Sequence, residues 1–346
     1  MSDMSDVNNE RRDSWDGQGE WPAASVIIVT RDRHEAAEAA VRSVLQVDYP
    51  AEKLEVVVIE ETDQPRPIEG DRVRYVAIPW RNLGLGFARN QGVKHSQGEV
   101  FAFTDDDCLI HRDWLRELVG PLLTEEGTAA IAGAVLVPVC GPVGQCENIL
   151  GFPGGGVKFI EEAQGEIVRR ATFSTCNCAV YRWAVEEVGG FREFNKSSGE
   201  DELLSRQISA RHPLLYTPHA IVWHEPRDSF GKVYGWLVRR GHSRVEMAQN
   251  VTDKGALYRR MALQSPLVRL AMANMAGMAV GLPLWFSPLV LVVLYYFSVL
   301  YRYRWSRNYH PSWKTFLLLP WVKATMDLAM DIGTIGKLFA RGKTEG

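Results

Sequence analysis

The sequence predicts an α/β protein with a doubly wound, mostly parallel sheet, followed by a C-terminal helical region that contacts a membrane. Three observations lead to this fold class. Strand-like apolar runs alternate with helical patterns in the first half of the chain, one of these runs ends in three consecutive aspartates, and a long stretch toward the C-terminus carries no charge. Strands that alternate with helices at this spacing are typical of parallel sheets with helices on both faces.

Short apolar runs predict the strands, and apolar residues three or four positions apart predict the helices. In the first part, the predicted strands are residues 24–30, 53–60, 73–78 and 100–104, and the predicted helices are residues 35–45, 88–94 and 113–118. Farther along, we expect a strand at 172–181, a short helix at 183–188, a helix at 200–210 and a last strand at 214–223. Between residues 127 and 170, frequent glycine and proline predict long loops around a site.

The bulk composition is that of an ordinary globular protein. Of the 346 residues, 46% are apolar and 23% are charged, and the net charge of -3 gives no sign of a nucleic-acid partner. The five cysteines are odd in number and irregularly spaced, so we expect reduced, mostly buried thiols. Residues 1–20 are polar and lack the apolar core of a signal peptide, which predicts a mobile tail and a catalytic part in the cytosol.

The charge-free stretch covers residues 271–301 and is interrupted by Gly281, Pro283 and Pro288. As one straight helix it would be about 46 Å long, more than the ~30 Å hydrocarbon core of a bilayer requires. The prolines argue against a single helix, and each half would be too short to span a bilayer alone. Arginines flank both ends of the stretch, at positions 259, 260, 269, 302, 304 and 307. We therefore expect a re-entrant hairpin with both ends on the cytoplasmic side.

Two alternatives to the hairpin are a single membrane span and a buried core hairpin in a soluble dimer. Residues 324–338 follow with the pattern of an amphipathic helix. Residues 227–244 are rich in arginine, and they could form a lid over a bound ligand or face anionic lipid headgroups. The sequence does not separate these last two interpretations.

The aspartates Asp105, Asp106 and Asp107 end the apolar run at 100–104. Adjacent carboxylates at the end of a buried strand repel one another, so such a cluster requires a cation. Oxygen ligands of this kind suit Mg²⁺ or Mn²⁺ bridged to a diphosphate. In an α/β sheet, ligands bind beyond the carboxyl ends of the strands, where these acids fall. The alternative is an acidic turn that caps the next helix.

Four segments in order carry a family resemblance. They are residues 25–33 (SVIIVTRDR), residues 82–92 (NLGLGFARNQG), the acids 105–107, and a half that runs from Cys176-Asn177 through Gly189-Gly190-Phe191 and Gly199-Glu200-Asp201 to His224. Together they resemble a family 2 glycosyltransferase with a GT-A fold, from about Ser25 to His224. The resemblance implies a metal-dependent, inverting transfer of a sugar from a nucleotide-diphosphate donor.

The resemblance also implies roles for the acids. Asp107 is expected to be the metal ligand, with Asp105 toward the ribose or the metal and Asp106 as a spacer. His224 would be a further ligand of Mg²⁺ or Mn²⁺. The alternative for His224 is a surface histidine in a turn.

Asp201 resembles the catalytic aspartate of the family's Glu-Asp pair. An inverting transfer needs one carboxylate that takes the proton of the acceptor hydroxyl during its attack on the anomeric carbon. Asp201 opens a predicted helix, where backbone N–H groups and the helix dipole keep a carboxylate ionised. The alternative is that Ser198 or Asp201 only caps this helix.

Thr30, Arg31 and Asp32 lie where the family cradles the nucleotide base. Glu61 stands where many relatives carry an aspartate that binds uracil, and this longer side chain leaves the base open among UDP, GDP and dTDP.

Arg89 should approach the nucleotide or its phosphate, and its alternative role is a salt bridge to the acid cluster. Gly84 and Gly86 would let the backbone come close to the nucleotide.

These inferences divide the chain into a tail (1–20), a nucleotide-sugar-binding half (21–130), an acceptor-binding and catalytic half (131–250) and a membrane-associated helical region (251–346). The expected acceptor is a lipid-linked molecule or a glycan at the cytoplasmic face of the cell membrane, with membrane lipid as a further partner. One alternative is a nucleotidyltransferase for sugar or lipid phosphates, although the turn after the first strand lacks the glycine-rich, lysine-containing loop typical of that class. The other is a membrane-anchored scaffold with a degenerate transferase fold.

Overall fold

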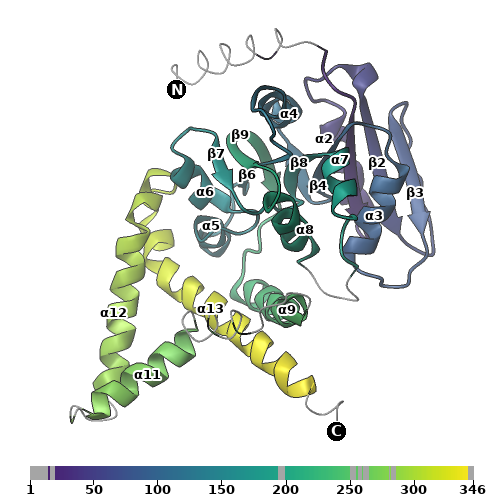
Figure 1. The fold of residues 1–346 in the computed structure, drawn as a ribbon. Coiled ribbons are helices and arrows are strands. Elements are labelled where there is room, and N and C mark those ends of the chain that lie inside the picture. The colour runs from purple at the N-terminus through teal and green to yellow at the C-terminus, as the bar shows by residue number, and fades with distance from the viewer. Residues whose placement is uncertain are drawn as a thin grey trace. The chain divides into compact units, whose positions relative to one another are not determined.

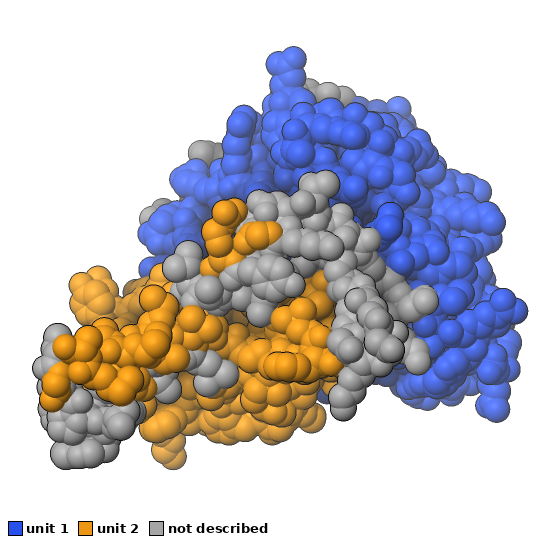
Figure 2. All heavy atoms as spheres, turned by 60° about the horizontal axis from the view of Figure 1, so that its bottom comes forward, with its two compact units in different colours: residues 1–138, 153–196, 200–225 blue, residues 139–152, 197–199, 226–346 orange. Residues whose placement is uncertain are grey.

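The computed structural model describes residues 15, 20–193, 199–249, 255, 259, 265–279, 281 and 286–341. The chain forms two compact units, coloured separately in Figure 2. Unit 1 comprises residues 1–138, 153–196 and 200–225, and unit 2 comprises residues 139–152, 197–199 and 226–346. The predicted division into a tail, two catalytic halves and a membrane region stays a prediction.

Unit 1 is built on one nine-stranded sheet (Figure 1). Its strands are β1 (Ala24–Thr30), β2 (Leu54–Glu61), β3 (Val73–Ile78), β4 (Val100–Asp105), β5 (Cys108–Ile110), β6 (Ala130–Leu136), β7 (Val168–Arg170), β8 (Asn177–Tyr181) and β9 (Leu214–His224). The order is β3-β2-β1-β4-β8-β6-β9-β5, and β7 pairs with β9. The first four strands are parallel, as the sequence predicts, whereas β8 runs antiparallel to both β4 and β6.

Helices cover both faces of this sheet. They are α2 (His34–Val44), α3 (Leu85–His95), α4 (Trp114–Thr124), α6 (Gly156–Ala163), α7 (Arg182–Glu187) and α8 (Glu200–Ser209). Helices α2 and α4 contribute to one apolar core, while α3, α6, α7 and α8 contribute to the other. Trp15, within the predicted tail, is buried in the first core, where its indole fills the space that a side chain at Gly120 would need.

The segment 127–170, predicted as loops, is the main difference from the sequence prediction. It contains strands β6 and β7 and helix α6 in unit 1, and helix α5 (Pro142–Ile149) in unit 2. Strand β6 has the sequence AIAGAVL, whose alanines and glycine have low β propensity, so its strand state comes from pairing with β8 and β9. The strand expected at 172–181 is also shorter, since β8 begins only at Asn177.

The register of the sheet gathers the strand ends that matter for function. Strand β1 lies between β2 and β4, with Thr30 opposite Glu60 and Val29 opposite Asp105. The short strand β5 turns back against β9, and this pairing places Cys108 opposite His224. Residues from five strands, β1, β2, β4, β5 and β9, therefore lie at the same end of the sheet.

Unit 2 consists of helices. They are α5, α9 (Phe230–Gln249), α11 (Pro266–Ala279), α12 (Phe286–Arg302) and α13 (Trp313–Arg341), with a 3-10 turn at Arg304–Asn308 between the last two. Helices α5, α9, α12 and α13 share an apolar core. Helix α13 crosses α9 at two glycines, because a Cβ at Gly333 would lie 2.1 Å from the Val238 carbonyl oxygen and one at Gly241 would lie 2.4 Å from the Met330 carbonyl oxygen.

The charge-free stretch divides between α11 and α12. The predicted division into two halves, 271–282 and 289–301, is confirmed. The second helix begins slightly earlier than expected, at Phe286, and Pro288 lies in its first turn, where a proline removes no helical hydrogen bond. Pro283 lies outside the described residues. Among the helices that the structure describes, none combines the length and the apolar character needed to cross a membrane. The helix predicted at 324–338 forms part of the longer α13.

Candidate active site

The acids at the end of β4 meet His224 at the end of β9. His224 Nε2 lies 3.3 Å from Asp107 Oδ1 and 3.7 Å from Asp105 Oδ2. His224 is 5% exposed, so the prediction that it belongs with the acids is preferred and the alternative of a surface histidine is wrong. The β5–β9 pairing causes this arrangement, and the backbone N–H of Glu225 also donates to the Asp107 carbonyl oxygen at 3.0 Å.

The orientation of the His224 ring suits metal binding. Its Nδ1 lies 2.8 Å from the carbonyl oxygen of Glu225, which can only accept a hydrogen bond. The assignment that follows is that Nδ1 carries a proton and that Nε2, which faces the two carboxylates, is the nitrogen that can bind a metal once its own proton has left. Burial lowers the pKa of His224, but its hydrogen bond to Asp105 and the charges of Asp107 and Asp105 outweigh burial and raise it.

Asp107 also fits a cation. Its Oδ1 is buried and has no hydrogen-bond partner, although it faces His224 Nε2. Buried polar atoms are rarely left without a partner, and two carboxylates beside an imidazole nitrogen form a ligand set that a divalent cation accepts. Asp105 supports the same interpretation, because hydrogen bonding to His224 and the charge of Arg89 overcome its burial and lower its pKa. Asp105, Asp107 and His224 can therefore hold a metal ion.

Cys108 Sγ also lies close to these ligands, since the ligand atoms of Asp107, Cys108 and His224 are all within 4.8 Å of one another. Burial raises the pKa of Cys108 well above its usual value, so the sulfur is a protonated thiol. A thiol is a poor metal ligand, since the thiolate is the binding form. We therefore assign the third ligand position to Asp105 and not to Cys108.

Asp106 turns away from His224. Its Oδ2 accepts a hydrogen bond of 2.7 Å from the Thr30 hydroxyl and one of 3.2 Å from Arg33 Nε. Burial, together with the charges of Asp107 and Asp105, raises the pKa of Asp106 to about 6, against the opposing effects of Arg33 and Thr30. This position agrees with the expected spacer and ties the end of β4 to the end of β1.

Arg89 connects the acid cluster to helix α8. Its guanidinium forms a buried ion pair with Glu200 and lies 3.6 Å from Asp105. Burial raises the pKa of Glu200, although the charge of Arg89 opposes this. The salt-bridge interpretation of Arg89 is thus confirmed, and its expected contact with the nucleotide stays a prediction.

Asp201 follows Glu200 in the first turn of α8. Its Oδ1 accepts a hydrogen bond of 2.8 Å from the backbone N–H of Glu202, so the helix terminus stabilises the carboxylate. The charge of Asp201 also acts on Arg89, alongside those of Glu200 and Asp105. Ser198, the other predicted cap, lies outside the described residues.

The residues predicted to hold the nucleotide base lie at the ends of β1 and β2. Glu61 Oε1 accepts hydrogen bonds from the backbone N–H groups of Arg81, at 3.1 Å, and Asn82. Arg31 Nη1 lies 2.9 Å from Asn82 Oδ1 and 3.4 Å from Glu61 Oε2. Asp32 has a φ of +58°, a left-handed conformation that aspartate tolerates. Glu61 thus anchors the loop before α3, a role that its sequence position alone does not reveal.

Sequence reasoning missed three features here. Arg33 forms ion pairs with two of the acids. The Arg31 guanidinium lies over the Trp80 ring, 5.7 Å from the ring centroid. Asn90 holds the turn before residue 194, since its side chain exchanges hydrogen bonds of 2.9 Å with the backbone of Phe191. The only sequence signal for these contacts is the motif residues themselves, because the partners lie far away along the chain.

Gly86 has a packing role, and its expected closeness to the nucleotide stays a prediction. A Cβ there would lie 2.2 Å from the Arg192 carbonyl oxygen, so Gly86 permits close packing of α3 against that backbone. Gly84 has a φ of +89°, which favours glycine before the first turn of α3.

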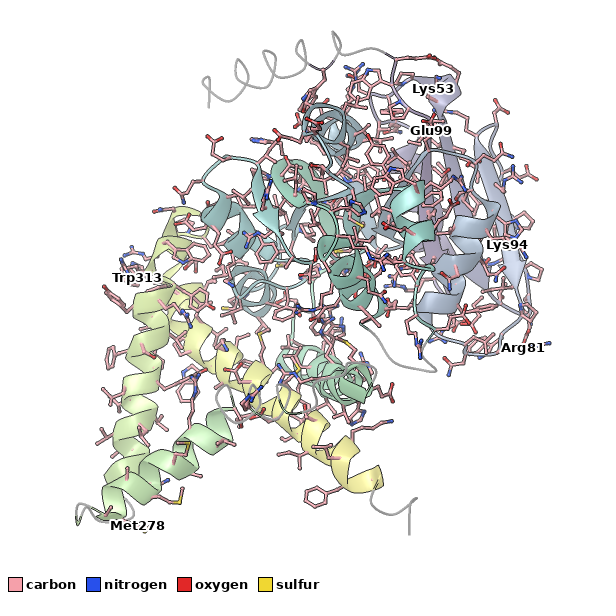
Figure 3. The ribbon with its side chains drawn as sticks, viewed as in Figure 1. Lys53, Arg81, Lys94, Glu99, Met278 and Trp313 are labelled. Atoms are coloured by element: carbon pink, nitrogen blue, oxygen red, sulfur yellow. The ribbon has the colours of Figure 1, made fainter. Side chains whose placement is uncertain are left out.

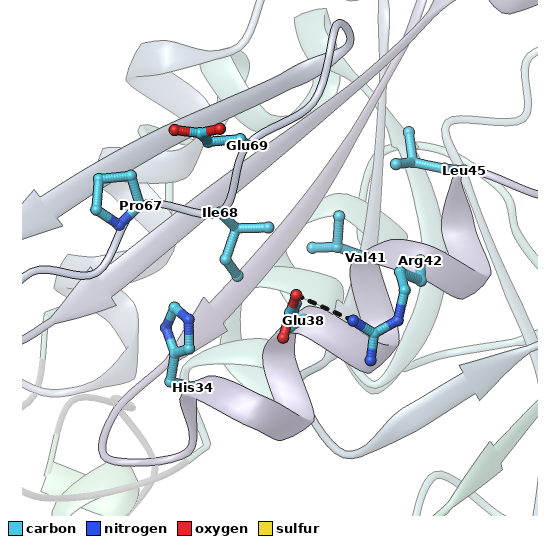
Figure 4. Close-up of a pocket in the computed structure, with 8 residues that line it drawn as sticks. All are labelled: His34, Glu38, Val41, Arg42, Leu45, Pro67, Ile68 and Glu69. Carbon is cyan, nitrogen blue, oxygen red and sulfur yellow. Dashed lines mark ion pairs between the residues drawn. The ribbon is translucent and has the colours of Figure 1, made fainter.

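A separate pocket of about 310 Å³ lies between α2 and residues 67–69 (Figure 4). None of the predicted site residues lines it. Two of its charged residues, Glu38 and Arg42, form an exposed ion pair of 3.0 Å with each other. This pocket is therefore distinct from the acid cluster.

Comparison with known proteins identifies the family. Residues 25–143 match the family model described as glycosyl transferase family 2. Over 229 residues, the chain is 31% identical to the succinoglycan biosynthesis protein ExoM of Rhizobium meliloti, which covers 62% of this chain and 70% of that protein. The chain belongs to glycosyltransferase family 2. It is therefore a glycosyltransferase, and the nucleotidyltransferase and scaffold alternatives are no longer needed.

A further relative and a solved structure are also similar to this chain. The chain is 28% identical over 258 residues to the glycosyltransferase AglE of Haloferax volcanii, an alignment that covers 70% of this chain and 79% of that protein. A solved structure of the mannosyltransferase PcManGT from Pyrobaculum calidifontis, in complex with GDP-Man and Mn²⁺, matches with a TM-score of 0.56 and 18% identity. That match covers 96% of this chain and 94% of the other, and it shows that the two proteins share a fold.

Proposed function

We propose that this family 2 enzyme is metal-dependent and inverting, and that it moves a sugar from a nucleotide-diphosphate donor to an acceptor hydroxyl. The observation that carries the proposal is the Asp107 carboxylate, whose buried Oδ1 lacks a hydrogen-bond partner and lies 3.3 Å from His224 Nε2. Asp107, Asp105 and His224 would hold Mg²⁺ or Mn²⁺. The Mn²⁺ in the PcManGT complex supports the choice of metal class.

The residues of the chain then divide the chemistry. When bound, the divalent cation would supply Lewis-acid neutralisation of the donor diphosphate. Asp201 would accept the proton of the acceptor hydroxyl as its oxygen attacks the anomeric carbon. The bond from that carbon to the donor phosphate oxygen breaks as the new bond forms on the opposite face, so the configuration inverts. Arg89 pairs with both Asp105 and Glu200, so it would fix the position of the general base Asp201, the neighbour of Glu200, relative to the metal-binding acids.

Thr30, Arg31, Asp32 and Glu61 would surround the nucleotide base. The donor sugar and the base, whether uracil, guanine or thymine, are left to experiment. Thermal unfolding with UDP, GDP and dTDP, each with and without Mn²⁺, tests the donor site. A ligand at a hundred times its dissociation constant should stabilise the enzyme by about 2.7 kcal/mol. Two results would contradict the proposed site: a nucleotide that stabilises the enzyme equally with and without Mn²⁺, or no stabilisation by any of the three nucleotides.

We also propose that the acceptor is a lipid-linked molecule or a glycan at the cytoplasmic face of the cell membrane, where unit 2 contacts lipid. Large apolar side chains are exposed on three helices, among them Met275 on α11, Leu294 and Phe297 on α12, and Trp321 on α13. Arginines stack on aromatic rings near the end of α12, with Arg304 4.3 Å from the Tyr301 ring centroid and Arg307 3.8 Å from that of Trp313. Aromatic and basic residues together are typical of a membrane interface.

Figure 3 labels Met278 near the end of α11 and Trp313 at the beginning of α13. The proposed hairpin has α11 and α12 as its arms, with Arg269 and Arg307 on the cytoplasmic side. Single cysteines at these two arginines, in a chain whose half-exposed Cys140 is replaced by serine, should react with a membrane-impermeant thiol reagent only from the cytosolic side. Reaction of either cysteine from the outer side would contradict the hairpin.

A further inference from the structure

Arg33, directly before helix α2, bridges two of the three acids at the end of β4. Its Nη1 lies 2.8 Å from Asp107 Oδ2, its Nε lies 3.2 Å from Asp106 Oδ2, and its Nη2 pairs with Asp106 Oδ1. The guanidinium thus binds Asp106 in a bidentate way through Nε and Nη2, and it binds Asp107 through Nη1. Such planar, multiple contacts make arginine a strong partner for carboxylates.

The Asp107 carboxylate is shared between this arginine and the candidate metal site. Its Oδ2 faces Arg33 while its Oδ1 faces His224. A divalent cation that binds Asp107 must therefore share a carboxylate with a guanidinium of like charge, and the two cations repel each other. The protein carries its own competitor for the metal.

Arg33 differs from the other two arginines near the site. Arg89 is buried and paired with Glu200, which fixes it in place. Arg31 is paired with Glu61 and Asn82, away from the acids. The Arg33 side chain, in contrast, is 46% exposed, whereas those of Asp106 and Asp107 are only 4% and 12% exposed. It can leave the acids without disturbing the core.

We propose that Arg33 is a tethered counter-ion that holds Asp106 and Asp107 in the donor-free enzyme and transfers to the donor diphosphate when metal and nucleotide bind. This inference rests on the proposed metal and donor site. Phosphate oxygens offer the guanidinium the same bidentate geometry as a carboxylate, so the exchange keeps its charge neutralised. The affinities for metal and nucleotide are therefore positively coupled. Either ligand displaces Arg33 from the acids, so the second ligand binds to a site that Arg33 has already left.

The test measures Mn²⁺ binding without nucleotide, from the electron paramagnetic resonance signal of free Mn²⁺. We expect Arg33→Gln to bind Mn²⁺ at least about tenfold more tightly than wild type, equal to about 1.4 kcal/mol. Arg31→Gln is the matched control. Arg31 lies two residues before Arg33, carries the same charge, and has a side chain of similar exposure, 45%. This control should leave the Mn²⁺ affinity within about twofold of wild type.

A second measurement repeats the Mn²⁺ titration with saturating UDP and with saturating GDP. In wild type the nucleotide should tighten Mn²⁺ binding strongly, and in Arg33→Gln this enhancement should fall by about tenfold. Arg33→Lys keeps the charge but cannot bridge two carboxylates, and its Mn²⁺ affinity should lie between the other two. It also provides a folded variant if Arg33→Gln unfolds.

The outcomes separate this inference from the proposed function. If Asp107→Asn abolishes Mn²⁺ binding but Arg33→Gln and Arg33→Lys bind Mn²⁺ as wild type does, the metal site stands and the counter-ion role is wrong. Equal tightening in Arg31→Gln would mean that any nearby charge has the same effect, which also overturns the specific role of Arg33. Failure of every variant to bind Mn²⁺, even with nucleotide, would overturn both.

Discussion

The edge of the sheet in unit 1 and the outer helices of unit 2 depart from the usual distribution of residues in opposite ways. At the ends of β4 and β9, charged groups are buried, with Asp106 4% and His224 5% exposed. On α12, large apolar groups are exposed, with Leu294 at 59% and Phe297 at 63%. Buried charges and exposed apolar patches are the two departures that most often indicate a binding site.

The two regions differ in how much of a binding partner's role the fold already fills. In unit 1, Arg89, Arg33 and His224 neutralise most of the acidic charge, and the Asp107 Oδ1 atom is left for a small ligand. In unit 2, the exposed side chains on α12 extend over several turns and match an extended apolar phase. A site for one cation should respond steeply to one substitution, whereas a surface for lipid should respond gradually.

The steepest response is expected for Asp107→Asn. The amide keeps the size of the side chain but loses the charge that faces His224, and metal catalysis contributes several kcal/mol of transition-state stabilisation. We expect transfer to fall more than about a thousandfold and Mn²⁺-dependent nucleotide binding to disappear, while the thermal unfolding midpoint without ligand stays close to wild type. Full activity in this variant would show that the metal assignment is wrong.

The next largest response is expected for Asp201→Asn. General-base catalysis contributes roughly 10²–10⁴-fold, so transfer should fall by that factor. Because Asp201 lies outside the proposed ligand set, nucleotide affinity in the presence of Mn²⁺ should remain close to wild type. Isothermal titration with nucleotide and single-turnover kinetics separate the two quantities. A loss of nucleotide binding would instead place Asp201 among the metal ligands.

The sequence predicts the first half of the fold well because its signals are local. Runs of valine and isoleucine, which favour the strand state, identify β1 and β2 to within a few residues. Strand β6 escaped prediction because its alanines and glycine favour no state by themselves, and its partners β8 and β9 lie more than forty residues away. The helix at Leu85 begins earlier than its pattern because Gly84 supplies the left-handed turn before it.

The candidate site was predictable in its residues but not in its pairings. The acids, His224 and Asp201 follow from motif order, and the structure brings Asp105, Asp107 and His224 together. Sequence position cannot tell which of several acids an arginine will choose, so the Arg33 contacts and the division of Arg89 between Asp105 and Glu200 come from tertiary packing alone. The roles of Thr30, Arg31 and Asp32 toward the nucleotide stay predictions.

A smaller effect, on stability, is expected for Glu200→Gln. Removing one partner of a buried ion pair costs about 3–5 kcal/mol, and the lower end applies because Asp105 remains 3.6 Å from Arg89. We expect the free energy of unfolding in urea to fall by about 3 kcal/mol. Glu202→Gln on the same helix is the control, since its partner Arg206 is exposed and such surface pairs contribute about 0.2–1 kcal/mol. Equal losses in both variants would contradict a structural role for the Arg89–Glu200 pair.

The smallest single effect is expected on the apolar face of unit 2, for Leu294→Glu. Leu294 is more than half exposed, so the substitution should leave the free energy of unfolding in solution within about 0.5 kcal/mol of wild type. If α12 contacts lipid, a leucine moved out of the apolar phase loses roughly 1.5–3 kcal/mol, and affinity for vesicles of anionic phospholipid should fall about tenfold or more. Val139→Glu is the matched control, because it adds the same charge at a fully exposed residue of unit 2 outside α11, α12 and α13. Sedimentation with vesicles measures both variants. Equal vesicle affinities would mean that α12 does not enter the bilayer, whereas a loss confined to Leu294→Glu would support the proposed membrane contact and leave the assignment of the acid cluster untouched.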